Sequence, residues 1–224
     1  MDLQIALLLG QDGIVNGAIY GLMAVALVLV FSVTRIIFIP QGEFVAYGAL
    51  TMAMMQTGKT PSTLWLLLAM AALALVVELW RASKGQAGNW PSTLLWTVAF
   101  PVLAALLALG VKPTSLLLQS LTALVLVMPM GPLLYRLAYR PVADKPVLLL
   151  LIISVALHGV LVGLGLLFFG AEGSRTTPFS EARFELMGMA VSGQSLVVLG
   201  VALVLVLALF VFFERTMIGK ALRA

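Results

Sequence analysis

Long apolar runs dominate this sequence and restrict its fold more than any other feature does. Inside hydrocarbon, every backbone polar group must be satisfied within the protein, and a helix of about 20 residues does so while crossing the bilayer core. We therefore predict an all-α, polytopic transmembrane helical bundle with about seven spans present. The second predicted span continues through Val45–Thr57. The other six are Gly13–Thr34, Thr63–Trp80, Thr93–Val111, Ser115–Tyr135, Val147–Phe169 and Ser195–Phe213.

The polar linkers between these runs are short, so we expect residues 1–224 to form a single transmembrane domain. Two linkers are longer than the others, from Arg136 to Pro146 and from Gly170 to Gln194. Prolines inside or near the ends of the runs predict kinks in the helices. These prolines are Pro101, Pro129 and Pro132.

The composition supports a membrane protein in contact with lipid. The chain is 62% hydrophobic and only 10% charged, whereas a soluble domain is about 25% charged. It has no cysteine, which excludes a disulfide scaffold and a thiolate metal site. Its net charge of +4 comes from basic residues scattered singly through short linkers, so we expect no nucleic-acid partner.

The distribution of basic residues predicts the orientation. Cytoplasmic linkers carry an excess of lysine and arginine, and seven spans place the two termini on opposite sides. A periplasmic N-terminus and a cytoplasmic C-terminus give that excess. The basic residues then on the cytoplasmic side are Arg35, Arg81, Lys84, Arg136, Arg140, Lys145, Arg215, Lys220 and Arg223.

The polar segment Arg35–Phe44 interrupts the apolar pattern. It brings Pro40, Gln41, Gly42 and Glu43 close to or within membrane depth, where a charge costs roughly 2.5–3.5 kcal/mol. Such a break is tolerated where the backbone faces protein or a polar cavity. One interpretation is a broken or re-entrant element that lines a substrate pathway. The other is a loop with Glu43 solvated at the membrane surface.

Glycines in the first apolar run predict close helix packing. Gly13, Gly17 and Gly21 recur every four residues and form a smooth stripe. Asn16 and Tyr20 lie beside this stripe, where they form a polar corner that we consider a second candidate for the pathway.

His158 is the only histidine of the chain, and it lies one helical turn after Ser154 and next to Gly159 and Gly163. A nucleophile and its base are one interpretation, but no Gly-x-Ser-x-Gly motif frames the serine. We favour a histidine that lines a cavity or forms an interhelical hydrogen bond, with both glycines serving helix packing.

Neither a nucleotide site nor a metal site is predicted. Gly58-Lys59-Thr60 resembles the end of a phosphate-binding loop, but Ala53 replaces its first glycine. The spans contain no cluster of metal ligands, so no cofactor is expected. Glu78 and Arg81, three residues apart near the end of a helix, are expected to form an ion pair.

In the order in which they occur, several motifs resemble those of the membrane permeases of branched-chain amino acid ABC importers, the LivH-type family. The likeness covers most of the chain apart from roughly Lys84 to Met130. The matching segments are Asn16-Gly17-Ala18-Ile19-Tyr20-Gly21-Leu22, Arg35–Phe44, Tyr139-Arg140-Pro141, Glu172-Gly173-Ser174-Arg175 and Ile218-Gly219-Lys220-Ala221-Leu222-Arg223-Ala224.

This resemblance implies a multi-pass permease in the bacterial inner membrane that forms a translocation pathway by alternating access. It implies a second permease subunit, two cytosolic ATPase subunits that hydrolyse the ATP, and a periplasmic substrate-binding protein. Gly219, Lys220 and Arg223 would then couple the permease to the ATPases, and the chain itself would not be an enzyme.

The chain departs from the family pattern in three places. Phe38, Ile39, Pro40 and Gln41 replace the Asn-Phe-Ala-His of the family, which leaves the substrate open. Residues 84–130 contain two more spans than the family usually has there. The family also continues past the segment that ends here at Ala224, so we expect the permease domain to be incomplete at its C-terminus.

A self-contained secondary transporter or channel remains the alternative. Such proteins usually need ionisable groups within the membrane, and Glu43 and His158 are the candidates here.

Overall fold

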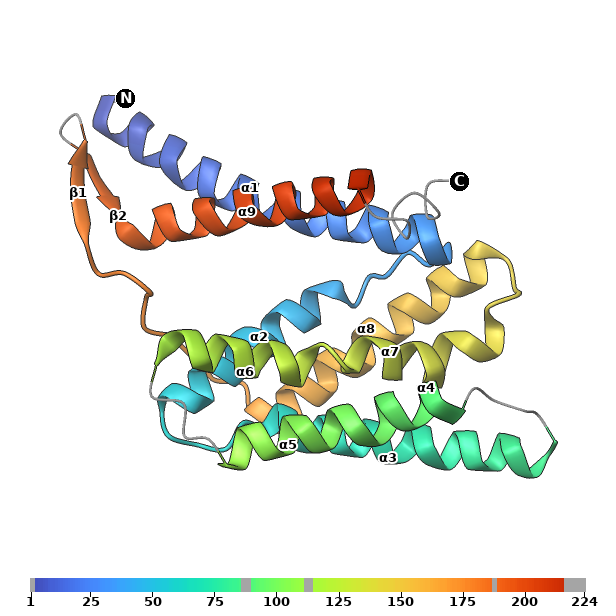
Figure 1. Ribbon diagram of the computed structural model, residues 1–224. Helices are drawn as coiled ribbons and strands as arrows, with labels where there is room; N and C mark the ends of the chain where they lie inside the picture. The colour runs from blue at the N-terminus through green and yellow to red at the C-terminus, as the bar shows by residue number, and fades with distance from the viewer. Residues whose placement is uncertain (1–2, 86–89, 111–114, 187–188, 216–224) are drawn as a thin grey trace. The chain divides into compact units, whose positions relative to one another are not determined.

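The computed structural model describes residues 3–85, 90–110, 115–186 and 189–215. In this part of the chain, six helices are long and apolar enough to cross a membrane (Figure 1). A seventh, shorter helix and a small β-hairpin accompany them. The six helices are α1 (Leu3–Thr34), α3 (Ser62–Ser83), a compound helix over 90–110, a second compound helix over 116–142, α8 (Val147–Phe169) and α9 (Gly193–Arg215). The prediction of a helical, multi-pass membrane protein is thus confirmed.

Helix α2 (Gln41–Gln56) differs from the predicted second span. Its 16 residues reach about 24 Å, less than the roughly 30 Å of a hydrocarbon core. It begins where the sequence places the proline break, since Pro40 cannot continue a preceding helix. The sidedness of the termini stays a prediction.

Both compound helices contain a turn of π-helix. The first consists of α4 (Trp90–Leu94), the π-turn η1 (Leu95–Ala99) and α5 (Phe100–Gly110), and the N–H of Phe100 bonds to the carbonyl of Leu95, five residues back. Pro101 follows this turn directly. Such π-turns absorb a local irregularity without ending the helix.

The second compound helix extends further than predicted. It consists of α6 (Leu116–Val127), α7 (Met130–Leu134), the π-turn η2 (Tyr135–Tyr139) and the 3₁₀ turn η3 (Arg140–Val142). The prediction of a linker from Arg136 was therefore wrong. The helix can continue here because Arg136 and Arg140 pair with the buried carboxylate of Glu78, described below.

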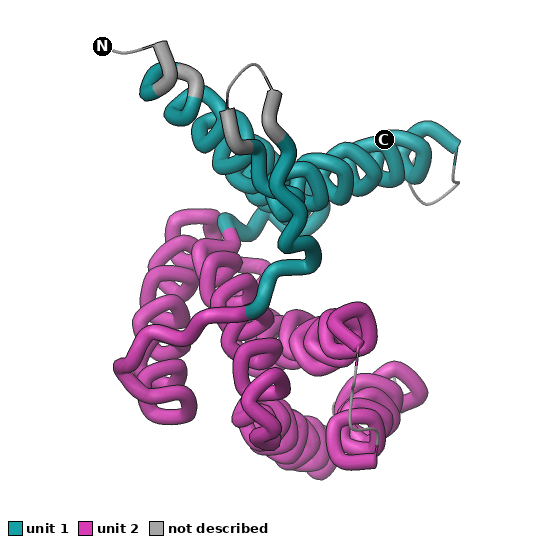
Figure 2. Tube along the Cα trace, turned by 90° about the vertical axis from the view of Figure 1, so that its left-hand side faces the viewer, with its two compact units in different colours: residues 1–37, 177–224 teal, residues 38–176 magenta. Residues whose placement is uncertain are grey.

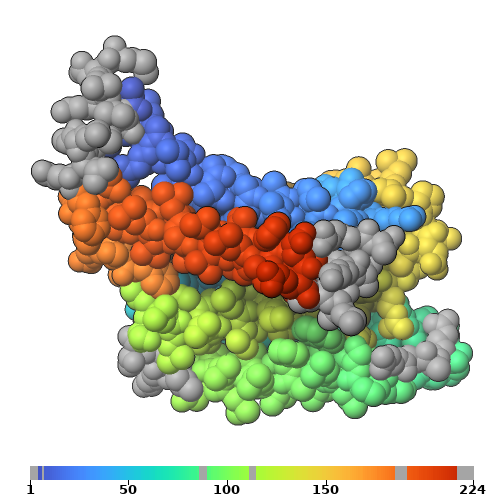
Figure 3. All heavy atoms as spheres, turned by 45° about the horizontal axis from the view of Figure 1, so that its top comes forward, coloured from blue at the N-terminus to red at the C-terminus, as the bar shows by residue number. Residues whose placement is uncertain are grey.

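The chain forms two compact units (Figure 2). Unit 1 comprises residues 1–37 and 177–224, and in it α1 contacts α9. The two helices present adjoining surfaces, coloured blue and red in Figure 3. Most of their apolar side chains are exposed, as expected of surfaces that meet lipid or another protein.

A hairpin precedes α9 in unit 1, within the segment that the sequence predicts as a linker. Strand β1 (Arg183–Leu186) pairs antiparallel with β2 (Met189–Ser192), with Arg183 opposite Ser192. At the start of α9, the N–H of Gly193 donates to the carbonyl of Ala182 at 2.7 Å, and a Cβ on Gly193 would lie 2.4 Å from Ser180 Oγ.

Unit 2 comprises residues 38–176 and holds α2, α3, both compound helices and α8. Helix α2 packs on α6 and α8, while α3 contacts α5, α6 and α7. Large apolar side chains fill the space between these helices. They include Leu64, Leu67, Leu126, Met130 and Leu133, all fully buried.

Candidate functional site

Arg35 marks the end of α1 in unit 1. Its φ of 58° is in the left-handed region, which is uncommon for a residue other than glycine. The N–H of Arg35 still bonds to the carbonyl of Phe31 at 2.8 Å, and the hydroxyl of Thr34 accepts from the N–H of Ile36 at 3.2 Å. The end of α1 is thus held by two specific hydrogen bonds.

The start of α2 in unit 2 is likewise held by specific contacts. The ring of Phe38 lies 5.4 Å from that of Phe44 and 6.2 Å from that of Tyr139, and Pro40 is fully buried. The N–H groups of Gln41 and Glu43 bond to the carbonyls of Phe38 and Pro40 at 3.3 and 3.2 Å. This part of the polar segment is therefore a packed turn against protein.

Glu43 and His158 come together across α2 and α8. Glu43 Oε1 lies 2.8 Å from His158 Nδ1, the distance of an ion pair, although no hydrogen bond of normal geometry forms at Nδ1. The Glu43 side chain is 13% exposed, so this carboxylate is not simply solvated. Its second oxygen, Oε2, is buried and has no hydrogen-bond partner in the described part of the chain.

Tyr47, one turn after Glu43, fastens α2 to α8. Its hydroxyl donates to the carbonyl of Leu161, and its ring lies 5.6 Å from that of Phe169. A Cβ on Gly165 would be 3.2 Å from Tyr47 Cε1, so the two helices approach closely at this glycine. Gly165 was not among the predicted packing glycines, because no motif in the sequence distinguishes it from its neighbours.

The predicted packing glycines have open space around them. A Cβ on Gly159 or Gly163 would meet nothing within 4 Å, and the same holds for Gly13, Gly17 and Gly21 of α1. Their role in packing stays a prediction. A segment that packs on these glycines would have to lie outside the described residues of the unit to which each glycine belongs.

The other predicted pathway residues lie in different places. Gln41 and Gly42 open α2 next to Glu43, whereas Asn16 and Tyr20 belong to unit 1 and are exposed on α1. The predicted ATPase-coupling residues Gly219, Lys220 and Arg223 lie outside the described residues.

Ser154 has a different partner from the one that a nucleophile would need. Its side chain is fully buried, and its hydroxyl lies 2.8 Å from the hydroxyl of Tyr139. It thus joins α8 to the second compound helix.

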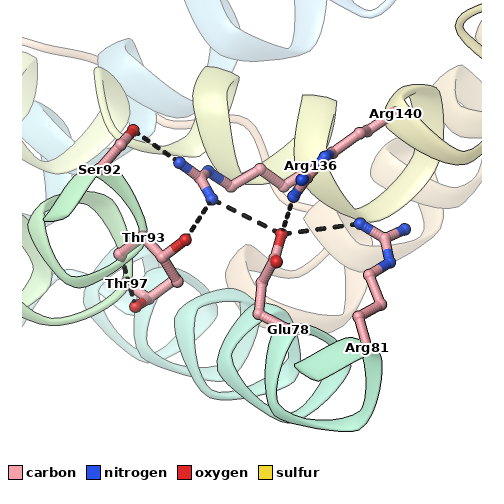
Figure 4. A network of polar contacts seen from close by, with 7 residues as sticks. All are labelled: Glu78, Arg81, Ser92, Thr93, Thr97, Arg136 and Arg140. Carbon is pink, nitrogen blue, oxygen red and sulfur yellow. Dashed lines mark hydrogen bonds and ion pairs between the residues drawn. The ribbon is translucent and has the colours of Figure 1, made fainter. Parts of the chain in front are cut away.

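A second polar cluster surrounds Glu78, which is 5% exposed on α3 (Figure 4). Glu78 Oε1 lies 3.6 Å from Nη1 of both Arg81 and Arg136, and it accepts a hydrogen bond from Arg140. The predicted pair of Glu78 and Arg81 is confirmed. Arg136 and Arg140 were missed, although a four-residue spacing places both on one helical face and was a usable signal.

Long apolar helices thus define the class of this protein, a multi-pass membrane protein. No protein-family model, no curated protein and no solved structure matches the chain. Among the described residues, no group of three histidine, cysteine, aspartate or glutamate side chains gathers to hold a metal ion.

Proposed function

We propose that this chain is a transport subunit whose substrate pathway passes the junction of α2 and α8 in unit 2. The observation that carries the proposal is the contact between Glu43 and His158, with a buried carboxylate oxygen left without a partner. Ionisable side chains within membrane spans are rare, and they mark substrate or ion pathways by default. The packed, proline-containing turn that precedes α2 supplies the irregular backbone that such pathways tolerate.

The resemblance to LivH-type permeases supports a more specific proposal. The chain would be the permease subunit of an ABC importer for branched-chain or related amino acids in a bacterial inner membrane. A second permease, two cytosolic ATPases and a periplasmic binding protein would complete the importer. Closure of the ATPases on nucleotide would move the helices and open the pathway on one side at a time.

The test is uptake of labelled leucine into vesicles that contain the chain together with candidate ATPase subunits produced alongside it. We expect ATP-dependent uptake, and we expect Glu43→Gln to reduce it at least about tenfold, because a lost charge-assisted contact costs about 1.5–3 kcal/mol. Asp144→Asn is the matched control, since Asp144 is an exposed linker carboxylate and its loss should leave uptake unchanged. Uptake that does not depend on ATP would contradict the importer.

The same contact favours one alternative, a secondary transporter that uses Glu43 and His158 for proton coupling. The two functions differ in their energy source. If Glu43→Gln left ATP-dependent uptake intact but abolished a flux driven by a proton gradient, the alternative would replace the importer.

A further inference from the structure

The cluster around Glu78 carries more positive charge than it needs to neutralise one carboxylate. Three guanidinium groups, from Arg81, Arg136 and Arg140, face the single oxygen Glu78 Oε1. The other described carboxylates of unit 2 lie elsewhere: Glu43 contacts His158, while Asp144 and Glu172 are exposed. Two positive charges therefore remain without a counter-ion in the described part of unit 2.

The three arginines differ in how completely they are bonded. Arg136 is held in place, since its Nη1 donates to Thr93 Oγ1 and its Nη2 to Ser92 Oγ, both at 2.8 Å (Figure 4). Arg81 contacts Glu78 only at 3.6 Å and donates no hydrogen bond within the described residues. The Arg140 side chain is 37% exposed. Arg81 and Arg140 thus keep donors for a further ligand.

Partly buried excess charge is costly unless an anion neutralises it. Arginine suits a phosphate group in particular, because its planar fork binds two oxygens at once. Basic pockets between transmembrane helices on the cytoplasmic side bind phospholipid head groups.

The cluster lies at the ends of transmembrane helices, the depth at which lipid head groups are found. It lies where α3 and the second compound helix end and the first compound helix begins, and the sequence predicts this end to be cytoplasmic. Trp80 on the last turns of α3 is 58% exposed, and Lys84 Nζ lies 3.9 Å above its ring. Exposed tryptophan is typical of the membrane–water interface.

We propose that Arg81 and Arg140, beside the fixed guanidinium group of Arg136, form a binding site for the phosphate group of an anionic phospholipid at the membrane edge of unit 2. The site is independent of the transport proposal, because it involves neither Glu43 nor His158. A network that only holds the helices together would bind no anion, and this difference makes the proposal testable.

The experiment uses the full chain, purified in detergent and freed of lipid. Its thermal unfolding midpoint is followed during titration with dioctanoyl phosphatidylglycerol, dioctanoyl phosphatidylcholine or inorganic phosphate. We expect the midpoint to rise with phosphatidylglycerol and not with phosphatidylcholine. The double variant Arg81→Gln with Arg140→Gln should weaken the apparent affinity for phosphatidylglycerol at least about tenfold.

Arg136 is left in place because it holds Ser92 and Thr93. Lys145→Gln is the matched control, since it removes an exposed cation close in sequence to Arg140 and should change the affinity less than about twofold. If the double variant does not fold, Arg81→Gln alone replaces it, because this change removes only the 3.6 Å contact.

Equal affinity of the wild type and the variant for phosphatidylglycerol would overturn the proposal, and so would an absence of any preference for the anionic lipid. If inorganic phosphate raised the midpoint at the same concentrations as phosphatidylglycerol, the ligand would be a soluble phosphate and the assignment to lipid would be wrong.

Discussion

Among the described residues of unit 2, Glu43 and Glu78 are the two carboxylates that form ion-pair contacts. Glu43 forms one ion-pair contact, with His158, whereas Glu78 forms three, with Arg81, Arg136 and Arg140. This difference in charge balance separates their roles. It is consistent with the two roles proposed above, a pathway for Glu43 and a lipid site at the membrane edge beside Glu78.

Glu78 also stabilises unit 2. Replacing it in Glu78→Gln leaves the three guanidinium groups facing a neutral amide, and breaking a buried ion pair by removing one partner costs on the order of 3 kcal/mol. We expect a clear fall in the thermal unfolding midpoint in detergent. Asp144→Asn removes the same charge from an exposed linker and should leave the midpoint unchanged. Equal midpoints for both variants would show that the network contributes nothing to stability.

At the scale of elements, the contact between α2 and α8 depends on Gly165. A methyl group there would lie 3.2 Å from Tyr47 Cε1, closer than an ordinary van der Waals contact. Because Tyr47 is fixed by its bond to the carbonyl of Leu161 and by the ring of Phe169, the tyrosine has little room to move.

We therefore expect Gly165→Ala to destabilise the protein by about 1–3 kcal/mol, the usual cost of overpacking. Gly163→Ala is the control on the same helix, where the added methyl meets nothing within 4 Å and alanine favours a helix by up to about 1 kcal/mol. The free energy of unfolding in mixed detergents measures both. A stabilising Gly165→Ala would mean that α2 does not lie this close to α8.

At the scale of the whole molecule, the number of crossings decides on which side each terminus lies. Helix α2 falls short of the hydrocarbon thickness by roughly 6 Å, a length that two residues of extended chain would supply at about 3.3 Å each. We expect a broken element of this kind to cross the membrane, which gives seven crossings and termini on opposite sides.

The absence of cysteine makes this prediction simple to test, because each introduced cysteine is the only one. We expect Gln4→Cys and Ser174→Cys to react with an impermeant maleimide added to intact cells. Ala143→Cys should react only after the membrane is opened. A Gln4→Cys variant labelled only after opening would mean that α2 does not cross.

The sequence by itself determined the membrane class, the helices and most of their bounds. The physical reason is that hydrocarbon forces each crossing segment to satisfy its backbone locally, so that the run of apolar residues specifies the helix. The start of α2 after Pro40 and the pair of Glu78 and Arg81 were also predictable, since both depend on neighbours in the sequence. Two bounds were wrong, because α1 begins at Leu3 rather than Gly13 and the second compound helix continues to Val142.

Only the tertiary structure decided which polar groups meet. His158 reaches Glu43, Arg136 and Arg140 reach Glu78, and Gly165 lies against Tyr47 because separate helices pack side by side. Those contacts depend on the rotation of each helix about its axis, and in the two compound helices the π-turns at Leu95–Ala99 and Tyr135–Tyr139 alter that rotation. Apolar runs in lipid do not specify that rotation, because every face of such a helix is hydrophobic.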